Sequence, residues 1–329
     1  MSATSIAPAG ALFIVMNAGS GHNDTASTRA IIEAILTQAG RAYRLVVVEE
    51  AARLADIARR TVEEAKAGDG VVVVAGGDGT INTVASALLG SGCPLGVLPQ
   101  GTFNYFARTH GIPEDTAEAT RALLTARVHP VQVGLVNDRL FLVNASLGLY
   151  PEMLEDREAF KQRFGRSRLV AIWAGIATAL KPQARMRITL QQHGRTSRMR
   201  SLTLFVGNNP LQLERVGIPL ADELREGHLV AIALQPIGRL ALLWLLLRGA
   251  LGRLGDAENL TSFGFAQMTV GTSSRYRKRR VKVATDGEVI SLAAPLDFRV
   301  SPQPLYLLKP DPVSDPTLTS QAPTGGRLP

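Results

Sequence analysis

The sequence predicts an N-terminal α/β domain with a parallel sheet, followed by a second, mostly antiparallel β-rich domain. The chain has 329 residues, enough for about two domains at ~100–200 residues each. Strand and helix patterns alternate through the first part, which is typical of βαβ units and a parallel sheet. From about residue 128, short apolar runs follow one another with few helical patterns between them, which indicates antiparallel strands.

In the first part, each apolar run ends at a turn and is followed by a helical pattern. Four consecutive valines at 71–74 are typical of a strand that is covered on both faces. Glycines at the ends of the helical patterns, such as Gly40, indicate where the helices stop. The predicted strands are 12–16, 45–48, 71–74 and 95–98, and the predicted helices end near residues 40, 66 and 89.

The second part is predicted to consist mainly of strands. They are 128–136, 140–147, 186–191, 201–206, 229–234, 268–271, 281–284 and 295–300, with helices near 153–180 and 238–253. These patterns divide the chain into a first domain at 10–127, completed by a strand within 303–309, and a second domain at 128–302. Residues 310–329 are rich in Pro, Ser and Thr, so we expect a disordered tail.

Composition and charge narrow the class of partner. The formal net charge is +8, which favours anionic partners such as nucleotide phosphates or acidic membranes. Aromatic residues make up only 5% of the chain, too few for the stacking platforms of single-stranded nucleic-acid binders, so nucleic acid is not expected. Cys93 is the single cysteine, which excludes an intrachain disulfide and a zinc site built on several thiolates.

One glycine-rich turn carries the strongest chemical signal. Gly76-Gly77-Asp78-Gly79-Thr80 lies between the four-valine strand and a predicted helix. Glycine lets the backbone turn sharply and approach a ligand, and free N–H groups at a helix start favour a phosphate. No Gly-Lys-Ser/Thr ending follows, so this is not a Walker A loop. Thr80 adds a hydroxyl donor, and Asp78 is the natural carboxylate for a magnesium ion.

A second turn follows the next predicted strand. It reads Gln100-Gly101-Thr102-Phe103-Asn104 and begins after residues 95–98. Parallel strands that are consecutive in the chain lie close together, and ligands bind at the carboxyl edge of open α/β sheets. We therefore expect the two turns to open on the same edge of the sheet.

Four segments together resemble the diacylglycerol kinase catalytic-domain family, which includes bacterial lipid kinases and the sphingosine and ceramide kinases. The two turns above resemble the family's glycine-threonine motifs. Asn17-Ala18-Gly19-Ser20-Gly21 resembles its Asn-Pro-x-Ser-Gly signature, and Asp286-Gly287-Glu288 resembles its Asp-Gly-Glu motif. The matches keep the family's order over about residues 11–300.

This resemblance implies an ATP-dependent lipid kinase with ATP and Mg²⁺ in a cleft between two domains. Glu288 would be the general base that takes the proton of the lipid hydroxyl, with Asp78 as the metal ligand and second catalytic carboxylate. The resemblance implies several acceptors: diacylglycerol, a sphingoid base, phosphatidylglycerol or a polyprenol. The residues implied to contact or shape the nucleotide site are Asn17, Ser20, Gly76, Gly77, Asp78, Gly79, Thr80, Asn82, Thr102 and Asn104.

The sequence departs from the family pattern at three places. Ala18 replaces a proline, and Glu49-Glu50-Ala51 stands where some members place a threonine near ATP. Tyr105 stands where many bacterial members have an aspartate, which places more weight on Asp78 and Glu288. Some members also bind a structural magnesium at an Asp-Gly-x-Leu turn; the nearest match here is Glu226-Gly227-His228-Leu229, with Asp222 upstream, and we favour a solvated turn.

Two other functions remain open at this point. An NAD kinase shares the Gly-Gly-Asp-Gly-Thr loop and a similar two-domain plan, whereas the Gly101 turn and Glu288 favour a lipid kinase. A non-catalytic nucleotide or lipid sensor is the second alternative, to which Tyr105 gives modest support.

A dense basic run precedes the Asp-Gly-Glu motif. Residues Arg275 to Arg280 read Arg-Tyr-Arg-Lys-Arg-Arg, which suits either anionic lipid headgroups or a solvated hairpin loop. The longest apolar run, 240–247, falls short of the ~20 residues that cross a bilayer. We therefore expect a cytoplasmic protein that reaches its lipid at the inner face of the membrane, without crossing it.

Overall fold

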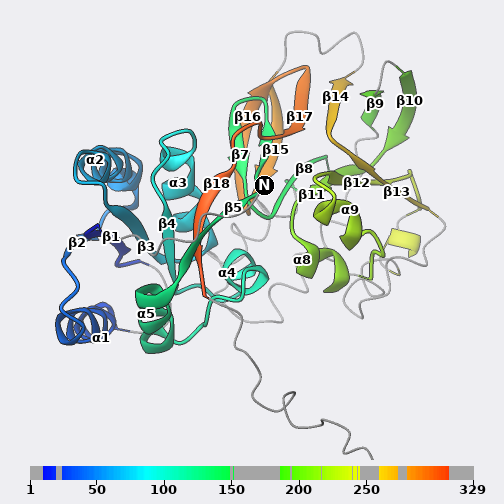
Figure 1. Cartoon of the computed structure of the whole chain (residues 1–329). Coiled ribbons are helices and arrows are strands. Elements are labelled where there is room, and N and C mark those ends of the chain that lie inside the picture. Colours follow the sequence, from blue (N-terminus) through cyan, green and yellow to red (C-terminus); the bar gives the residue numbers. More distant parts are fainter. Residues whose placement is uncertain are drawn as a thin grey trace, which may run out of the picture.

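The computed structural model contains three sheets arranged as two structural parts (Figure 1). It describes residues 10–19, 24–148, 151, 186–192, 195–215, 217–238, 240–242, 244, 259–272 and 280–310. The predicted helices near 153–180 and 238–253 lie largely outside these residues, as does the predicted tail. Within the described residues, no helix combines the length and apolar character needed to cross a membrane.

The first part is an α/β domain, as predicted. Its sheet has the order β2-β1-β3-β4-β18-β5, in which all neighbouring pairs are parallel except β18 and β5. The strands are β1 (Leu12–Asn17), β2 (Tyr43–Val48), β3 (Val71–Gly76), β4 (Leu95–Pro99), β5 (Arg127–Val131) and β18 (Leu305–Lys309). The last of these returns from the far end of the chain to the first sheet.

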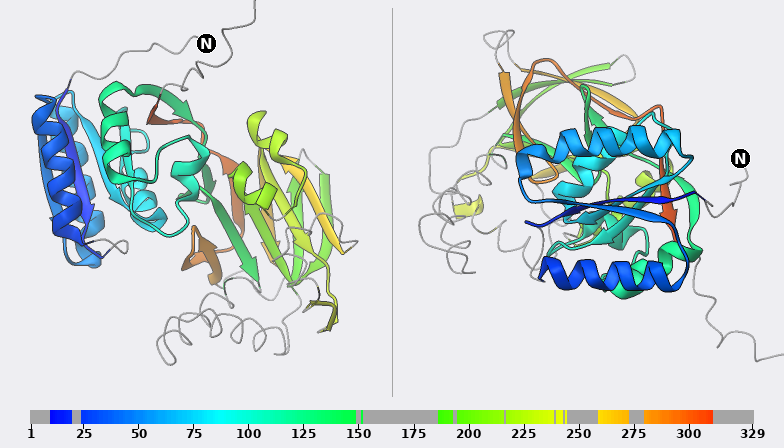
Figure 2. Two further views of the ribbon diagram at one scale, coloured as in Figure 1. Left: turned by 90° about the horizontal axis from the view of Figure 1, so that it is seen from below. Right: turned by 90° about the vertical axis from the view of Figure 1, so that its left-hand side faces the viewer.

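Helices cover both faces of this sheet, which explains why β3 is buried along its whole length. α1 (Thr25–Gln38) and α5 (Thr116–Thr125) pack together, and α2 (Leu54–Ala67) packs on α3 (Asp78–Leu88). Figure 2 shows α1 and α2 on opposite sides of the sheet. A short helix, η1 (Ala51–Arg53), precedes α2, and α4 (Tyr105–Thr109) follows β4.

The second part is a sandwich of two six-stranded antiparallel sheets. Alternate residues of both sheets, among them Phe141, Leu147 and Phe298, share one buried core. One sheet has the order β10-β9-β14-β17-β6-β7 and the other β13-β12-β11-β8-β15-β16. The strands are β6 (Gly134–Val136), β7 (Arg139–Phe141), β8 (Asn144–Gly148), β9 (Met186–Gln192), β10 (Arg195–Ser201), β11 (Thr203–Gly207), β12 (Leu229–Leu234), β13 (Leu260–Phe265), β14 (Gln267–Thr272), β15 (Arg280–Thr285), β16 (Glu288–Ala293) and β17 (Leu296–Val300).

Several details differ from the sequence-based expectation, among them the following. The run 128–136 is two strands, and the first of them, β5, belongs to the first sheet, so the chain passes to the second part between Val131 and Gly134 rather than at residue 127. Two short helices of the second part, α8 (Pro210–Arg215) and α9 (Ala221–Arg225), were not predicted.

Candidate active site

The first glycine turn lies where β3 ends and α3 begins. Gly77 is the N-cap residue of α3 and makes no side-chain cap hydrogen bond, and the first backbone N–H groups of an α-helix have no intrahelical acceptor. A Cβ at Gly76 would stand 2.5 Å from the Cβ of Thr80, so a larger residue would displace Thr80. The N–H groups of a helix start and the positive end of its dipole suit a phosphate.

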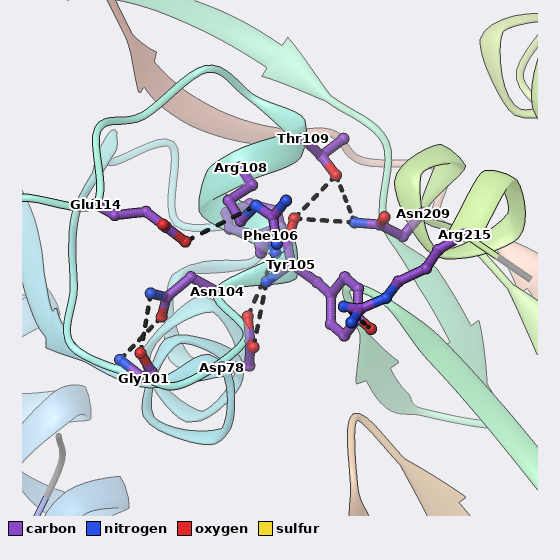
Figure 3. Close-up of polar contacts among 10 residues, drawn as sticks. All are labelled: Asp78, Gly101, Asn104, Tyr105, Phe106, Arg108, Thr109, Glu114, Asn209 and Arg215. Atoms are coloured by element: carbon purple, nitrogen blue, oxygen red, sulfur yellow. Dashed lines mark hydrogen bonds and ion pairs between the residues drawn. The ribbon is translucent and has the colours of Figure 1, made fainter. Parts of the chain in front are cut away.

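The two glycine turns touch each other, as expected for turns on one sheet edge. A Cβ at Gly101 would stand 2.9 Å from the Cα of Gly77. The N–H of Gly101 donates to Oδ1 of Asn104 at 2.9 Å, and Nδ2 of Asn104 donates back to the carbonyl of Gly101 at 3.0 Å (Figure 3). Asn104 is buried and has a φ of 49°, in the left-handed region that asparagine tolerates. Its side chain therefore shapes the second turn.

Asn17 reaches the same corner from the end of β1. Its Nδ2 donates to Oγ1 of Thr80 at 2.8 Å, and its Oδ1 accepts from the N–H of Gly19 at 3.0 Å. The structure thus joins the ends of three strands at one corner, which we call the phosphate corner: Asn17, Gly76–Thr80 and Gly101–Asn104. Ser20, which the sequence also places at this site, lies outside the described residues.

Asp78 holds the start of α4 against the phosphate corner. Its two carboxylate oxygens accept backbone N–H groups of Tyr105 and Phe106, both at 3.3 Å (Figure 3). Burial raises the pKa of Asp78 above its usual value, and these backbone hydrogen bonds oppose that shift. Asp78 therefore has a structural task in addition to the metal-binding role predicted for it.

Glu288 comes from the second part of the chain and meets the first turn of α3. Its Oε1 lies 3.5 Å from the point where a Cβ of Gly79 would stand. Glu288 is exposed and is the first residue of β16. Glu288, which follows Gly79 by 209 positions in the sequence, thus lies directly beside the helix start that suits a phosphate.

The turn that carries Glu288 is anchored by Asp286, which is half-buried. Asp286 and Gly287 form the two-residue turn between β15 and β16 with φ values of 48° and 91°, the conformation that Asp-Gly pairs favour in hairpins. The carboxylate of Asp286 accepts three backbone N–H groups, from Leu142 at 2.7 Å and from Val143 and Asn144 at 2.9 Å each.

Asn82 connects this anchor to the first domain. Its Nδ2, on α3, donates to Oδ2 of Asp286 at 2.6 Å and to the carbonyl of Leu140 at 3.2 Å. Burial raises the pKa of Asp286, against the lowering effect of its four hydrogen bonds. Asn82 therefore holds the Asp-Gly-Glu turn against α3, one helical turn from Gly79.

A second set of contacts between the two parts, on α4, was not predicted from the sequence. Nδ2 of Asn209 donates to Oγ1 of Thr109 at 2.7 Å and to the carbonyl of Tyr105 at 3.2 Å (Figure 3). Arg215 donates to the hydroxyl of Tyr105 at 3.3 Å, and the Tyr105 ring stacks on Phe103 with centroids 5.7 Å apart. Tyr105, which departs from the family pattern, thus contacts the second part of the chain.

The remaining predicted positions are less defined. Thr102 is exposed beside Gly101. At the turn that resembles a magnesium site, one possible ligand atom from each of Glu223, Glu226 and His228 lies within 4.8 Å of the other two. Asp222, upstream of this turn, forms an ion pair with Arg225 at 2.5 Å. Glu226 is exposed, and the solvated turn expected from the sequence stays a prediction.

In the basic run Arg275–Arg280, only Arg280 is described; it is exposed and donates to the carbonyl of Ser291 at 2.8 Å.

Comparisons with known proteins bear on this geometry. Residues 11–136, which contain both glycine turns and Asn17, match the family model described as diacylglycerol kinase catalytic domain. The resemblance drawn from the motifs is therefore confirmed for the diacylglycerol kinase catalytic domain.

A solved structure extends the likeness in fold beyond the diacylglycerol kinase catalytic domain. The crystal structure of a diacylglycerol kinase from Bacillus anthracis aligns with a TM-score of 0.65 and 18% identity, over 91% of this chain and 96% of that one. At this identity the comparison supports the two-part fold alone.

Relatives in sequence match shorter stretches. An uncharacterized protein of Synechocystis is 29% identical over 251 residues, which is 74% of this chain and 55% of that protein. A Pseudomonas aeruginosa protein named "Probable lipid kinase YegS-like" is 50% identical over 94 residues, 28% of this chain and 31% of that protein. The chain thus aligns with 31% of the length of one of these two relatives and 55% of the other.

Proposed function

We propose that the protein is an ATP-dependent lipid kinase that transfers the γ-phosphoryl group to a lipid hydroxyl at the inner face of the membrane. The observation that carries this proposal is the position of Glu288 beside Gly79. A carboxylate next to a phosphate-binding helix start is the pair of groups that phosphoryl transfer to a hydroxyl needs, because the reaction depends on positioning and charge stabilisation. The family of residues 11–136 supports the same activity.

The residues have separate tasks in this reaction. The N–H groups at the start of α3 and the hydroxyl of Thr80 bind phosphate oxygens. The Glu288 carboxylate takes the proton of the lipid hydroxyl as its oxygen bonds to the γ-phosphorus, and the bond from that phosphorus to the β–γ bridging oxygen breaks, releasing ADP.

The donor set also fits a magnesium ion. Two carboxylates, Asp78 and Glu288, border the phosphate corner, and oxygen ligands are those that Mg²⁺ prefers. Of the two, Asp78 would hold the ion. When bound, Mg²⁺ would neutralise phosphate charge.

An NAD kinase is the enzyme alternative, and a sensor without turnover is the other. Both predict a phosphate corner, but only a lipid kinase requires Glu288 to face an acceptor hydroxyl at a lipid surface. The position of Glu288 beside Gly79 therefore argues against a sensor without turnover, whereas only the acceptor separates the two kinases, because both transfer phosphate to a hydroxyl.

The proposal predicts a specific transfer of label. Purified full-length protein is incubated with γ-labelled ATP and Mg²⁺, together with either a total lipid extract in vesicles or NAD. We expect label in an organic-soluble lipid phosphate and none in NADP, and mass spectrometry of the labelled product would identify the acceptor. Label in NADP alone would establish the alternative enzyme, and the absence of label from both acceptors with ATP still bound would favour a sensor.

A further inference from the structure

A pocket of about 660 Å³ lies between the two parts of the chain, beside α4. Its walls come from α4, from β5 and the linker after it, from α8 and α9, and from the end of β18. Asp78, Gly79 and Glu288 do not line it. Phe106 does line it, while the N–H of Phe106 binds Asp78, so the pocket and the phosphate corner contact different sides of one short helix.

The pocket has an apolar wall and the size of a small-molecule site. Phe106, Leu142, Leu211 and Leu224 contribute apolar side chains, and Val131 adds another from β5. Small-molecule sites commonly measure about 300–1,000 Å³ and combine such walls with a few polar groups. The pocket therefore suits a ligand with an apolar part.

The polar end of the pocket is positive. Burial lowers the pKa of His110, and the positive charge of Lys309 lowers it further, to about 3. His110 is therefore neutral near pH 7 and packs edge-on to Phe106 with centroids 4.8 Å apart. Arg225, at the same pocket, already pairs with Asp222.

Lys309 and His110 have polar atoms available to a ligand. Within the described parts of the chain, no carboxylate forms an ion pair with Lys309, although Glu214 also lines the pocket, and neither ring nitrogen of His110 has a hydrogen-bond partner. Binding of an anion beside Lys309 would be favourable, because an unpaired charge next to apolar walls costs free energy.

We propose that this pocket is a second ligand site, which binds a small amphipathic anion with its acidic group against Lys309 and His110 and its apolar chain along Phe106, Leu211 and Leu224. The site is separate from the phosphate corner, and its occupancy does not depend on the proposed function. A lipid phosphate, the product class of the proposed reaction, belongs to this ligand class, and so does a fatty-acid carboxylate.

Calorimetric titration of the full-length protein tests the proposal with four probes below their micelle concentrations. Octyl phosphate and octanoate represent the two sources of an amphipathic anion, octanol lacks the charge, and inorganic phosphate lacks the chain. We expect saturable binding of at least one of the two anions, and at least tenfold weaker binding of octanol and inorganic phosphate. Equal binding of octanol would overturn the role of the charge.

Variants locate the binding site. Lys309→Met keeps the apolar stem and should weaken binding of the anion at least tenfold. Lys66→Met removes the same charge from an exposed position on α2, outside the pocket, and should change nothing. Leu211→Trp adds bulk at the pocket wall and should weaken binding without any change of charge. Unchanged binding in both pocket variants, or displacement of octyl phosphate by a non-hydrolysable ATP analogue, would contradict a separate site.

Discussion

Replacement of Glu288 by glutamine is expected to lower the turnover number of phosphoryl transfer by about 10²–10⁴-fold, the usual contribution of a general base. Glutamine keeps the size of the side chain beside Gly79 but cannot take a proton. ATP affinity should change little, because the contacts proposed for the phosphate groups are mainly the N–H groups at the start of α3. Steady-state kinetics with labelled ATP and calorimetric ATP titration measure the two quantities.

The matched control is Glu63→Gln, which removes an exposed carboxylate from α2, away from both glycine turns. Its turnover should equal that of the unaltered protein. If Glu288→Gln also retained full turnover, Glu288 would not be the base, and Asp78 would be the remaining carboxylate at the corner. A loss of ATP binding in Glu288→Gln would instead indicate that Glu288 acts on the nucleotide.

Replacement of Asp286 by alanine is expected to lower the free energy of unfolding by at least about 3 kcal/mol. The change leaves three backbone N–H groups and Nδ2 of Asn82 without their acceptor in a partly buried place, and each unsatisfied buried group costs about 1–3 kcal/mol. Turnover should fall as well, since Asp286 positions the turn that carries Glu288. Urea denaturation of the full-length chain measures the stability.

Asp138→Ala is the control for this second change. Asp138 occupies the similar two-residue turn between β6 and β7, but its side chain is fully exposed. We expect a stability change within about 0.5 kcal/mol, as for other exposed positions. Equal stability of the Asp286 and Asp138 variants would show that the anchor has no energetic role.

The sequence predicted most of the elements, and the strands it missed share a physical property. β10, β13 and β16 were not predicted, and each of them lies at an edge of its sheet. Edge strands carry polar and charged residues that limit pairing with other chains, so their apolar alternation is weak. β10, with the sequence Arg-Thr-Ser-Arg-Met-Arg-Ser, is the clearest example. Central strands such as β3 are apolar throughout and were predicted readily.

At the candidate site, residues in short motifs were predicted, whereas contacts between distant segments were missed. The glycine turns and Glu288 were predicted because their residue types carry the chemistry in short motifs. The contacts of Asn209 and Arg215 with α4 were missed, because α8 has only six residues and its partners lie about 100 positions earlier in the chain. A pattern of neighbouring residues contains no information on such pairs.

The central claim is that the phosphate corner and Glu288 form one site around the terminal phosphate of ATP. A crystal structure of the protein with a non-hydrolysable ATP analogue and Mg²⁺ tests it most directly. We expect the γ-phosphate at the first N–H groups of α3, within the two glycine turns, and the Glu288 carboxylate on its open side. An analogue bound elsewhere, or a γ-phosphate that no hydroxyl could reach from the side of Glu288, would contradict it.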